Sequence, residues 1–188
     1  ACRTPIPVNC PRFVQLIREH RRFLLTTHIR PDCDALGSCL GMAGILEQLG
    51  KQVRIVNGQA TPPNLKFIDP EHRIQAIAVD VQPAELLADG FDLLMVLDTS
   101  AWAQIGPMGD IVRATKATKM VLDHHESSDD LGAELFKDTA AEATGRLVAQ
   151  AAEKLGVPIS PQIARPLLAA LATDTGWFRF ASTTAETF

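Results

Sequence analysis

Short apolar runs alternate with longer amphipathic stretches along this chain of 188 residues. The short runs are typical of strands covered on both faces, and the longer stretches repeat their apolar positions at helical spacing. This pattern predicts strands at 23–27, 52–56, 73–79, 91–97 and 119–122, a helical turn at 83–87, and helices at 35–49, 142–155 and 161–173. Such an alternation favours an α/β fold with a parallel sheet of about five strands and helices on both faces.

Composition narrows the class of protein without naming a function. The chain is 46% hydrophobic and 21% charged, which is typical of a soluble globular domain and excludes a disordered tail, a collagen-like repeat or a disulfide miniprotein. Its length suits one domain, with residues 59–64 as a surface loop. The net charge of -4 and an aromatic content of 5% predict no general basic or base-stacking surface, so any phosphate-bearing ligand needs local binding groups.

Cysteine usage and hydropathy bear on the cellular compartment. The four cysteines (Cys2, Cys10, Cys33 and Cys39) form no C-x-x-C pair, and no apolar run reaches the length of a membrane span. Residues 1–5 lack the apolar segment of a signal peptide. We therefore expect reduced thiols in a cytoplasmic protein that is neither membrane-inserted nor exported, unless a leader was removed.

Four polar segments follow predicted strands or end a predicted helix: 28–34 (HIRPDCD), 98–100 (DTS), 123–125 (DHH) and 173–176 (TDTG). Ligands of open parallel sheets bind where the strands end, so these segments should converge. Together they supply five aspartates and three histidines, whose charges repel unless cations neutralise them. This predicts a metal site with more than one ion. Oxygen ligands with some imidazoles favour Mn or Mg, with Fe or Co as alternatives, and paired divalent ions hydrolyse phosphate esters.

Each segment also has a purely structural explanation. Asp98 could cap the element after its strand, and Asp32 and Asp34 could cap the helix that follows them. The pair of histidines could be exposed or satisfied in the core, and Asp174 could belong to a helical turn. All four segments fall at the same edge of the predicted sheet, and this joint placement favours the metal site.

The four segments, in this order, resemble the motifs of the DHH phosphoesterase family: HIRPDCDALGS (28–38), VLDTS (96–100), VLDHH (121–125) and ATDTG (172–176). The similarity runs from about residue 13 to residue 184. Within the family, PDCDALGS with the later ATDTGWFRF resembles the bifunctional oligoribonuclease and adenosine bisphosphate phosphatase branch. The manganese pyrophosphatase branch usually has Ser-Ile where this chain has Ala35-Leu36, which disfavours pyrophosphate as a substrate.

The resemblance implies a role for each motif residue. Asp123 would orient the metal-bound histidine, and His125 would face the substrate phosphate or leaving group, so these two residues and Asp98 form the predicted catalytic set. Gly37 would allow close packing at the start of its helix. The implied metal ligands are His28 and Asp32 for the first ion, Asp34, His124 and Asp174 for the second, and Asp98 for both.

The implied function is a two-metal phosphoesterase of short oligonucleotides, attacked from the 3′ end, and of 3′-phosphoadenosine 5′-phosphate. Its cofactors would be two divalent ions, with Mn favoured over Mg, Co or Fe, and its partner a short RNA or nucleotide. Cyclic or linear dinucleotides and polyphosphate or pyrophosphate remain alternative substrates, and a non-catalytic metal-dependent nucleotide-binding module is a further alternative. The oligomeric state stays open, with a homodimer as one alternative.

Two features depart from the family pattern. Residues 140–146 (AAEATGR) lack the usual Ser-rich stretch and the acid after the Thr-Gly pair. The family also has a second, smaller domain beyond the fourth motif that grips the nucleotide. We therefore expect residues 1–188 to form the DHH catalytic domain of a two-domain protein, without its substrate-binding domain.

Overall fold

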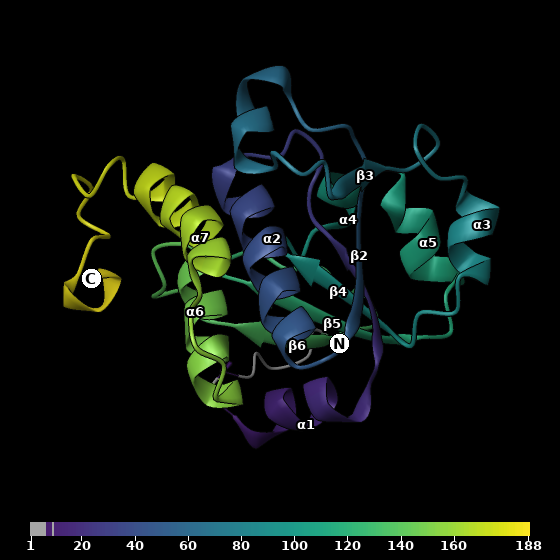
Figure 1. The fold of residues 1–188 in the computed structure, drawn as a ribbon, viewed down its shortest axis with the longest axis horizontal. Helices are drawn as coiled ribbons and strands as arrows, with labels where there is room; N and C mark the ends of the chain where they lie inside the picture. Colours follow the sequence, from purple (N-terminus) through teal and green to yellow (C-terminus); the bar gives the residue numbers. More distant parts are fainter. Residues whose placement is uncertain (1–6, 9) are drawn as a thin grey trace.

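A parallel sheet of six strands forms the centre of the computed structural model, which describes residues 7–8 and 10–188 (Figure 1). The spatial order of the strands is β3-β2-β1-β4-β5-β6, and every neighbouring pair is parallel. The strands are β1 (Arg22–Thr26), β2 (Gln52–Asn57), β3 (Ile74–Ala76), β4 (Leu93–Leu97), β5 (Thr118–Asp123) and β6 (Glu134–Lys137).

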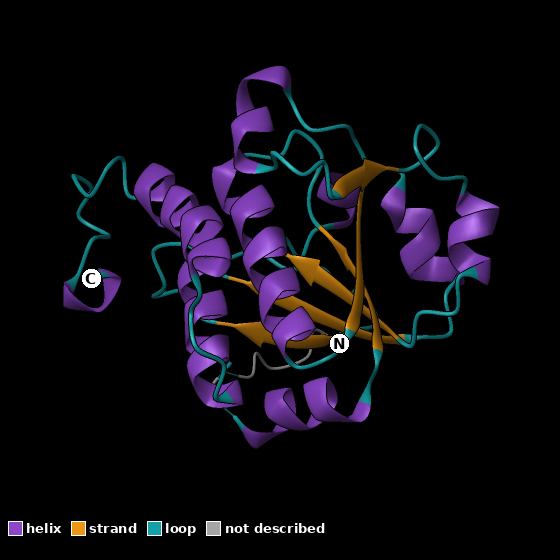
Figure 2. Cartoon of the chain, in the orientation of Figure 1, coloured by secondary structure: helices purple, strands orange, loops and turns teal. Residues whose placement is uncertain are grey.

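Helices cover both faces of this sheet, as the sequence predicts. Figure 2 shows the orange strands between two groups of purple helices. One face packs against α1 (Pro11–Glu19), α2 (Cys33–Gln48) and α6 (Thr144–Leu155), and α7 (Pro161–Asp174) packs against α2 and α6. The other face packs against α3 (Pro83–Ala88), α4 (Trp102–Ile105) and α5 (Met108–Ala114), and short 3₁₀ turns lie at η1 (Pro63–Ile68) and η2 (Ala185–Thr187).

The apolar runs are strands with two buried faces. In β1, Phe23 and Leu25 join the core beneath α2, whereas Leu24 joins the core beneath α5. The same alternation holds in β4, where all five residues are buried. Side chains of a strand point alternately to its two faces, so a strand that is covered twice is apolar throughout.

The sheet has six strands where the sequence pattern predicts about five. The additional strand is β6, whose sequence ELFK is short and has a charged residue at each end. The hydrophobic pattern also does not predict α1, α4 or α5, because these helices are short. The helices expected at 35–49 and 142–155 begin at Cys33 and Thr144.

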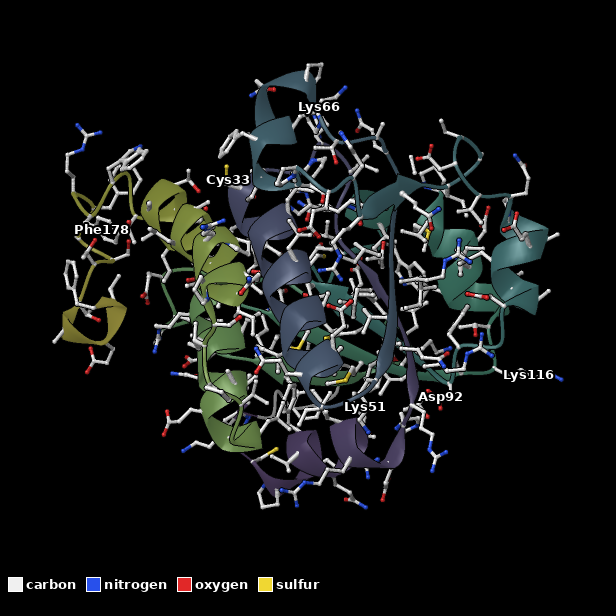
Figure 3. The ribbon with its side chains drawn as sticks, in the orientation of Figure 1. Cys33, Lys51, Lys66, Asp92, Lys116 and Phe178 are labelled. Carbon is white, nitrogen blue, oxygen red and sulfur yellow. The ribbon has the colours of Figure 1, made fainter. Side chains whose placement is uncertain are left out.

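The site lies where the direction of the strand order reverses. From β1 the chain continues outward to β2 and β3, and it then returns to place β4 on the other side of β1. A crevice opens at such a switch point, beyond the carboxyl ends of the two central strands. Figure 3 labels Cys33 at this edge, where α2 begins after β1, whereas Asp92 and Lys116, which precede β4 and β5, lie at the opposite end.

Helices α2 and α7 approach each other very closely at Gly37. A Cβ atom on Gly37 would lie 2.3 Å from the carbonyl oxygen of Pro166 in α7. This confirms the expected close packing at the start of α2. The contact brings α2, which carries Asp34 of the first motif, against α7, which carries Asp174.

Cys10, Cys33 and Cys39 are free thiols, and Cys2 lies outside the described residues. Within the part of the chain that the structure describes, no helix is both long enough and apolar enough to span a bilayer.

The Gly37 contact generates a prediction about stability. We expect Gly37→Ala to lower the free energy of unfolding by about 1–3 kcal/mol, because the new methyl group meets a backbone atom that cannot move aside. Gly109→Ala is the control, since the nearest atom to its Cβ is the end of the flexible Arg113 side chain at 3.3 Å, and the ring of Trp102 lies at an ordinary contact distance of 3.7 Å. Urea unfolding measures both variants, and equal stabilities would contradict the proposed tight contact.

Candidate metal centre

Asp98 occupies the centre of the site, directly after β4. Its backbone has a φ of 62°, and its amide donates to the carbonyl of Leu122 at 2.9 Å. Aspartate and asparagine tolerate this left-handed conformation better than other non-glycine residues. The side chain is 2% exposed, so a carboxyl group sits in the protein interior. Strained backbone and a buried carboxyl group at one residue are typical of a functional position.

A first group of possible ligands consists of His28, Asp32 and Asp98. Nε2 of His28 lies 3.4 Å from Oδ2 of Asp98 and 3.9 Å from Oδ2 of Asp32. Asp32 also caps α2, because its Oδ1 accepts the amide of Ala35 at 3.0 Å. Asp32 therefore both caps α2 and belongs to the site, because capping uses one carboxylate oxygen and the other faces His28.

A second group consists of Asp34, His124 and Asp174. Nε2 of His124 lies 3.7 Å from Oδ2 of Asp34 and 3.5 Å from Oδ2 of Asp174. The same nitrogen lies 3.6 Å from Oδ1 of Asp98. The two oxygens of Asp98 thus face different groups, Oδ2 toward His28 and Oδ1 toward His124.

The imidazoles of both groups are oriented for metal binding. Nδ1 of His28 is 2.9 Å from the carbonyl oxygen of Ile29, and Nδ1 of His124 is 3.1 Å from that of Ala141. A carbonyl only accepts, so each Nδ1 donates to it, and each Nε2 faces the acids, where it can bind a metal ion. This arrangement is the usual one for metal-binding histidines.

The spacing of the ligand atoms also suits divalent cations. Two ligand atoms bound to one ion at about 2.1 Å lie about 3.0–3.4 Å apart, close to the separations around His28 and His124. Oxygen atoms with one imidazole per group are the ligands of Mn²⁺ and Mg²⁺ sites rather than of structural zinc sites. The donor set therefore fits one hard divalent cation in each group.

The carboxylates resist ionisation in the protein alone. Burial, followed by repulsion from Asp34 and Asp32, raises the pKa of Asp98 well above its ordinary value. Burial and the same kind of repulsion raise the pKa of Asp174 to about 7. Burial also raises the pKa of Asp34. A divalent cation would reverse these shifts, because it stabilises the ionised form of each carboxylate.

His125 forms a further possible group with Asp98 and His124, but it is held differently from His124. Its Nδ1 donates to Oδ1 of Asp123 at 2.8 Å, and this hydrogen bond raises the pKa of His125. Burial tends to raise the pKa of Asp123, but hydrogen bonds from His125 and Ser100 outweigh it, and the net shift is downward. The side chain of His125 is 47% exposed, so this ring faces solvent more than His124 does.

The role expected for Asp123 requires a correction. We expected Asp123 to orient the metal-bound histidine, His124, but it contacts His125, and the carbonyl of Ala141 orients His124 instead. Asp123 ends β5, and its side chain points to the face that also carries Ser100 and Lys137. The next residue, His124, points the other way, toward α2 and α7, because side chains alternate along an extended chain.

The start of α6 supports both groups and was not identified as functional from the sequence. Thr144 donates its amide to Oδ2 of Asp34 at 2.7 Å and its hydroxyl to Oδ1 of Asp98 at 2.9 Å. The amide of Gly145 donates to Oδ1 of Asp34 at 2.8 Å. Free amides at a helix N-terminus bind anions, so α6 holds Asp34 with its backbone. In the sequence, the Thr-Gly pair before a helical pattern was the signal that could have identified this helix start as part of the site.

The raised carboxyl pKa values predict how pH affects the metal-free protein. Unfolded aspartates titrate near pH 3.9, so between about pH 4 and pH 7 the native state keeps protons that the unfolded state releases. This contribution to stability is present below that window and is lost as the pH rises through it. We expect the melting temperature in chelator to be several degrees lower at pH 8 than at pH 5, with a smaller difference for Asp174→Asn. A melting temperature that rises across this interval would contradict the prediction.

The contacts of Thr144 predict a specific loss of metal affinity. Thr144→Val removes the hydroxyl that orients Asp98, and we expect Mn²⁺ to bind about 10-fold more weakly in calorimetric titrations. Thr144→Ser keeps the hydroxyl and should bind as the wild type does. Thr26→Val is the matched control, because the buried hydroxyl of Thr26 has no hydrogen-bond partner among residues 7–8 and 10–188. Equal affinities for the two valine variants would show that the hydroxyl of Thr144 has no role.

Known proteins resemble this chain in sequence and in fold. It is 34% identical over 164 residues to the bifunctional oligoribonuclease and PAP phosphatase NrnA of Thermus thermophilus, covering 86% of this chain and 46% of that protein. It is 26% identical to a "probable manganese-dependent inorganic pyrophosphatase" of Staphylococcus haemolyticus, covering 85% and 50%. An exopolyphosphatase-related protein from Bacteroides fragilis superposes with a TM-score of 0.86 at 25% identity, covering 99% and 55%.

The alignments cover most of this chain but only about half of each curated relative, so the chain spans about half the length of the curated relatives it matches. The family described as "DHH family, N-terminal domain" matches residues 22–171, which include β1 to β6 and the first three motifs. The match extends over most of the sheet and its covering helices, and so this chain belongs to the DHH family.

Proposed function

We propose that this chain is the catalytic domain of a two-metal phosphoesterase that hydrolyses short oligonucleotides from the 3′ end and 3′-phosphoadenosine 5′-phosphate. One observation carries this proposal: the two oxygens of Asp98 face two separate groups of ligands. Paired divalent ions that share a carboxylate are the usual machinery of phosphate-ester hydrolysis. Mn²⁺ is the favoured ion, since the ligands are mainly oxygens and a relative is named as manganese-dependent.

Each residue has a distinct task in this proposal. His28 and Asp32 would hold one ion, the second group would hold the other, and Asp98 would serve both. When bound, such ions lower the pKa of a water molecule and neutralise the charge that develops on phosphoryl oxygens. His125 faces the substrate phosphate or the leaving group with its Nε2, because Nδ1 is bonded to Asp123.

The substrate class is supported by similarity to the relative from Thermus thermophilus, which is named an oligoribonuclease and PAP phosphatase. The similarity to a protein named as a pyrophosphatase supports the alternative substrate. At the start of α2, this chain has Ala35 and Leu36, whose apolar side chains are fully buried and offer no hydrogen bond to a second phosphate. This local sequence favours nucleotides over pyrophosphate.

Substrate affinity must come largely from outside the metal centre. The chain has a net charge of -4, and the ions would contact only the phosphate that is cleaved. Polyanions bind proteins mainly through basic groups that neutralise several phosphates. We therefore propose that a further, nucleotide-gripping domain accompanies this chain and supplies most of the affinity for RNA.

The test begins with Asp98→Asn in the 188-residue chain. Asparagine tolerates the left-handed backbone at this position, so the fold should persist, and the loss of a bridging carboxylate should leave less than about a tenth of wild-type turnover of a chromogenic phosphodiester in Mn²⁺. Elemental analysis should find two Mn²⁺ per wild-type chain. Asp110→Asn is the control, because this side chain is exposed and lies on α5, away from the site.

Substrate choice is tested in the same assay. Short RNA, 3′-phosphoadenosine 5′-phosphate, a cyclic dinucleotide and pyrophosphate are compared at equal concentration. Preferential release of 5′-mononucleotides from RNA and of phosphate from the bisphosphate agrees with the proposal. Hydrolysis of pyrophosphate alone would replace it with the alternative, and binding without any turnover would favour a nucleotide-binding module.

A further inference from the structure

Lys137 is a buried cation beside the site, and the sequence analysis did not single it out. It ends the edge strand β6, and its side chain is only 2% exposed. In the register of the sheet, Lys137 lies directly opposite Asp123 of β5, so both side chains point to the same face. Lysine is rarely buried to this extent unless its ammonium group is paired.

The ammonium group of Lys137 has three oxygen atoms around it. It donates to the carbonyl of Ser127 at 2.7 Å and to the hydroxyl of Ser100 at 3.2 Å, and it lies 3.4 Å from Oδ2 of Asp123. The hydroxyl of Ser100 itself donates to Oδ2 of Asp123 at 2.6 Å. Lys137 therefore connects three segments: the end of β5, the turn after β4, and the loop that follows His125.

These contacts converge on one oxygen of Asp123 and leave the other for His125. Oδ1 of Asp123 accepts both the amide of His125 at 3.1 Å and its Nδ1 at 2.8 Å. The carboxylate is thus clamped on one side by Lys137 and Ser100 and on the other by the histidine. A carboxylate fixed in this way sets both the angle of the imidazole and the nitrogen that carries the proton.

We propose that Lys137 is a positioning residue for His125: its ammonium group fixes Asp123 and Ser100, and Asp123 holds the imidazole by its Nδ1–H, which lies 3.9 Å from Oδ1 of Asp98, and leaves Nε2 free for the substrate. The proposal rests on the proposed function, in which His125 meets the substrate. Without Lys137, Asp123 would keep the hydroxyl of Ser100 but lose its cationic partner, and the loop at Ser127 would lose its anchor. The ring of His125 would then sample other orientations.

A purely structural role for Lys137 predicts a different result from a positioning role. If the role of Lys137 is structural, its replacement should lower stability and impair metal binding, substrate binding and turnover together, whatever residue stands at position 125. A positioning lysine acts only while His125 is present, because its effect passes through that ring. A double-mutant cycle separates the two cases.

The kinetic test uses Lys137→Met, which keeps the length and removes the charge. We expect kcat for a chromogenic phosphodiester in saturating Mn²⁺ to fall about 10- to 100-fold, with KM and Mn²⁺ affinity within about twofold of wild type. The double variant with His125→Ala should be no slower than His125→Ala alone. Lys119→Met is the matched control on the neighbouring strand β5, where the amino group donates to the carbonyl of Val112 at 3.4 Å, and it should keep wild-type kcat.

A spectroscopic test is independent of turnover. Long-range ¹H–¹⁵N spectra of the histidine rings should show His125 as the Nδ1–H tautomer in the wild type and as a mixture in Lys137→Met, with the signal assigned by its absence in His125→Ala. If the wild type turns over none of the substrates, the proposed function fails, and the tautomer of His125 still decides the role of Lys137.

Several results would overturn the role of Lys137. One is an unchanged His125 tautomer in Lys137→Met, and another is an equal fall in kcat with and without His125. Lys137→Gln serves as a second variant if the methionine variant does not fold, because its amide can still donate to Ser127. Failure of both variants to fold would assign Lys137 a structural role and would also reject the proposal.

Discussion

Repulsion between carboxylates that are held together at one edge of the sheet is the constraint on which the rest of this site depends. Asp34 and Asp98 are almost fully removed from solvent, and Asp174 lies close by. Burial raises the pKa of each, and repulsion from neighbouring carboxylates raises the pKa of Asp98 and Asp174 further. Without a cation, this arrangement lowers the free energy of unfolding. A role in stabilising the fold therefore does not explain the cluster, whereas cation binding does.

The protein opposes this repulsion with backbone groups rather than with basic side chains. The first amides of α6 and the hydroxyl of Thr144 bind Asp34 and Asp98, and backbone carbonyls hold His28 and His124. Arginine or lysine at these places would neutralise the carboxylates and remove the reason to bind a cation. Hydrogen bonds from neutral donors fix the geometry and leave the negative charge available.

The buried basic side chain of Lys137 contacts a neighbour of the candidate ligands rather than the ligands themselves. Lys137 pairs with Asp123, which does not belong to the candidate metal groups, and through it approaches the exposed histidine. The two consecutive histidines therefore differ in their surroundings. His124 points inward to three carboxylates, whereas His125 lies toward solvent with a carboxylate behind it. Alternation of side chains along an extended segment produces this division from two identical residues.

The sequence by itself determined the α/β class, the covered strands and the four polar segments, because buried strands must be apolar and strand ends in a parallel sheet must converge. It did not predict β6, since ELFK is too short and too charged for its hydrophobic pattern to stand out. For the same reason Lys137 was missed, and Thr144 was noticed only as part of a motif. The partner of Asp123 was misjudged, because one residue of strand register decides whether a side chain meets His124 or His125. Only the tertiary structure could decide these points, since each depends on contacts between segments far apart in the chain, as with Asp34 and Gly145, which the linear pattern does not contain.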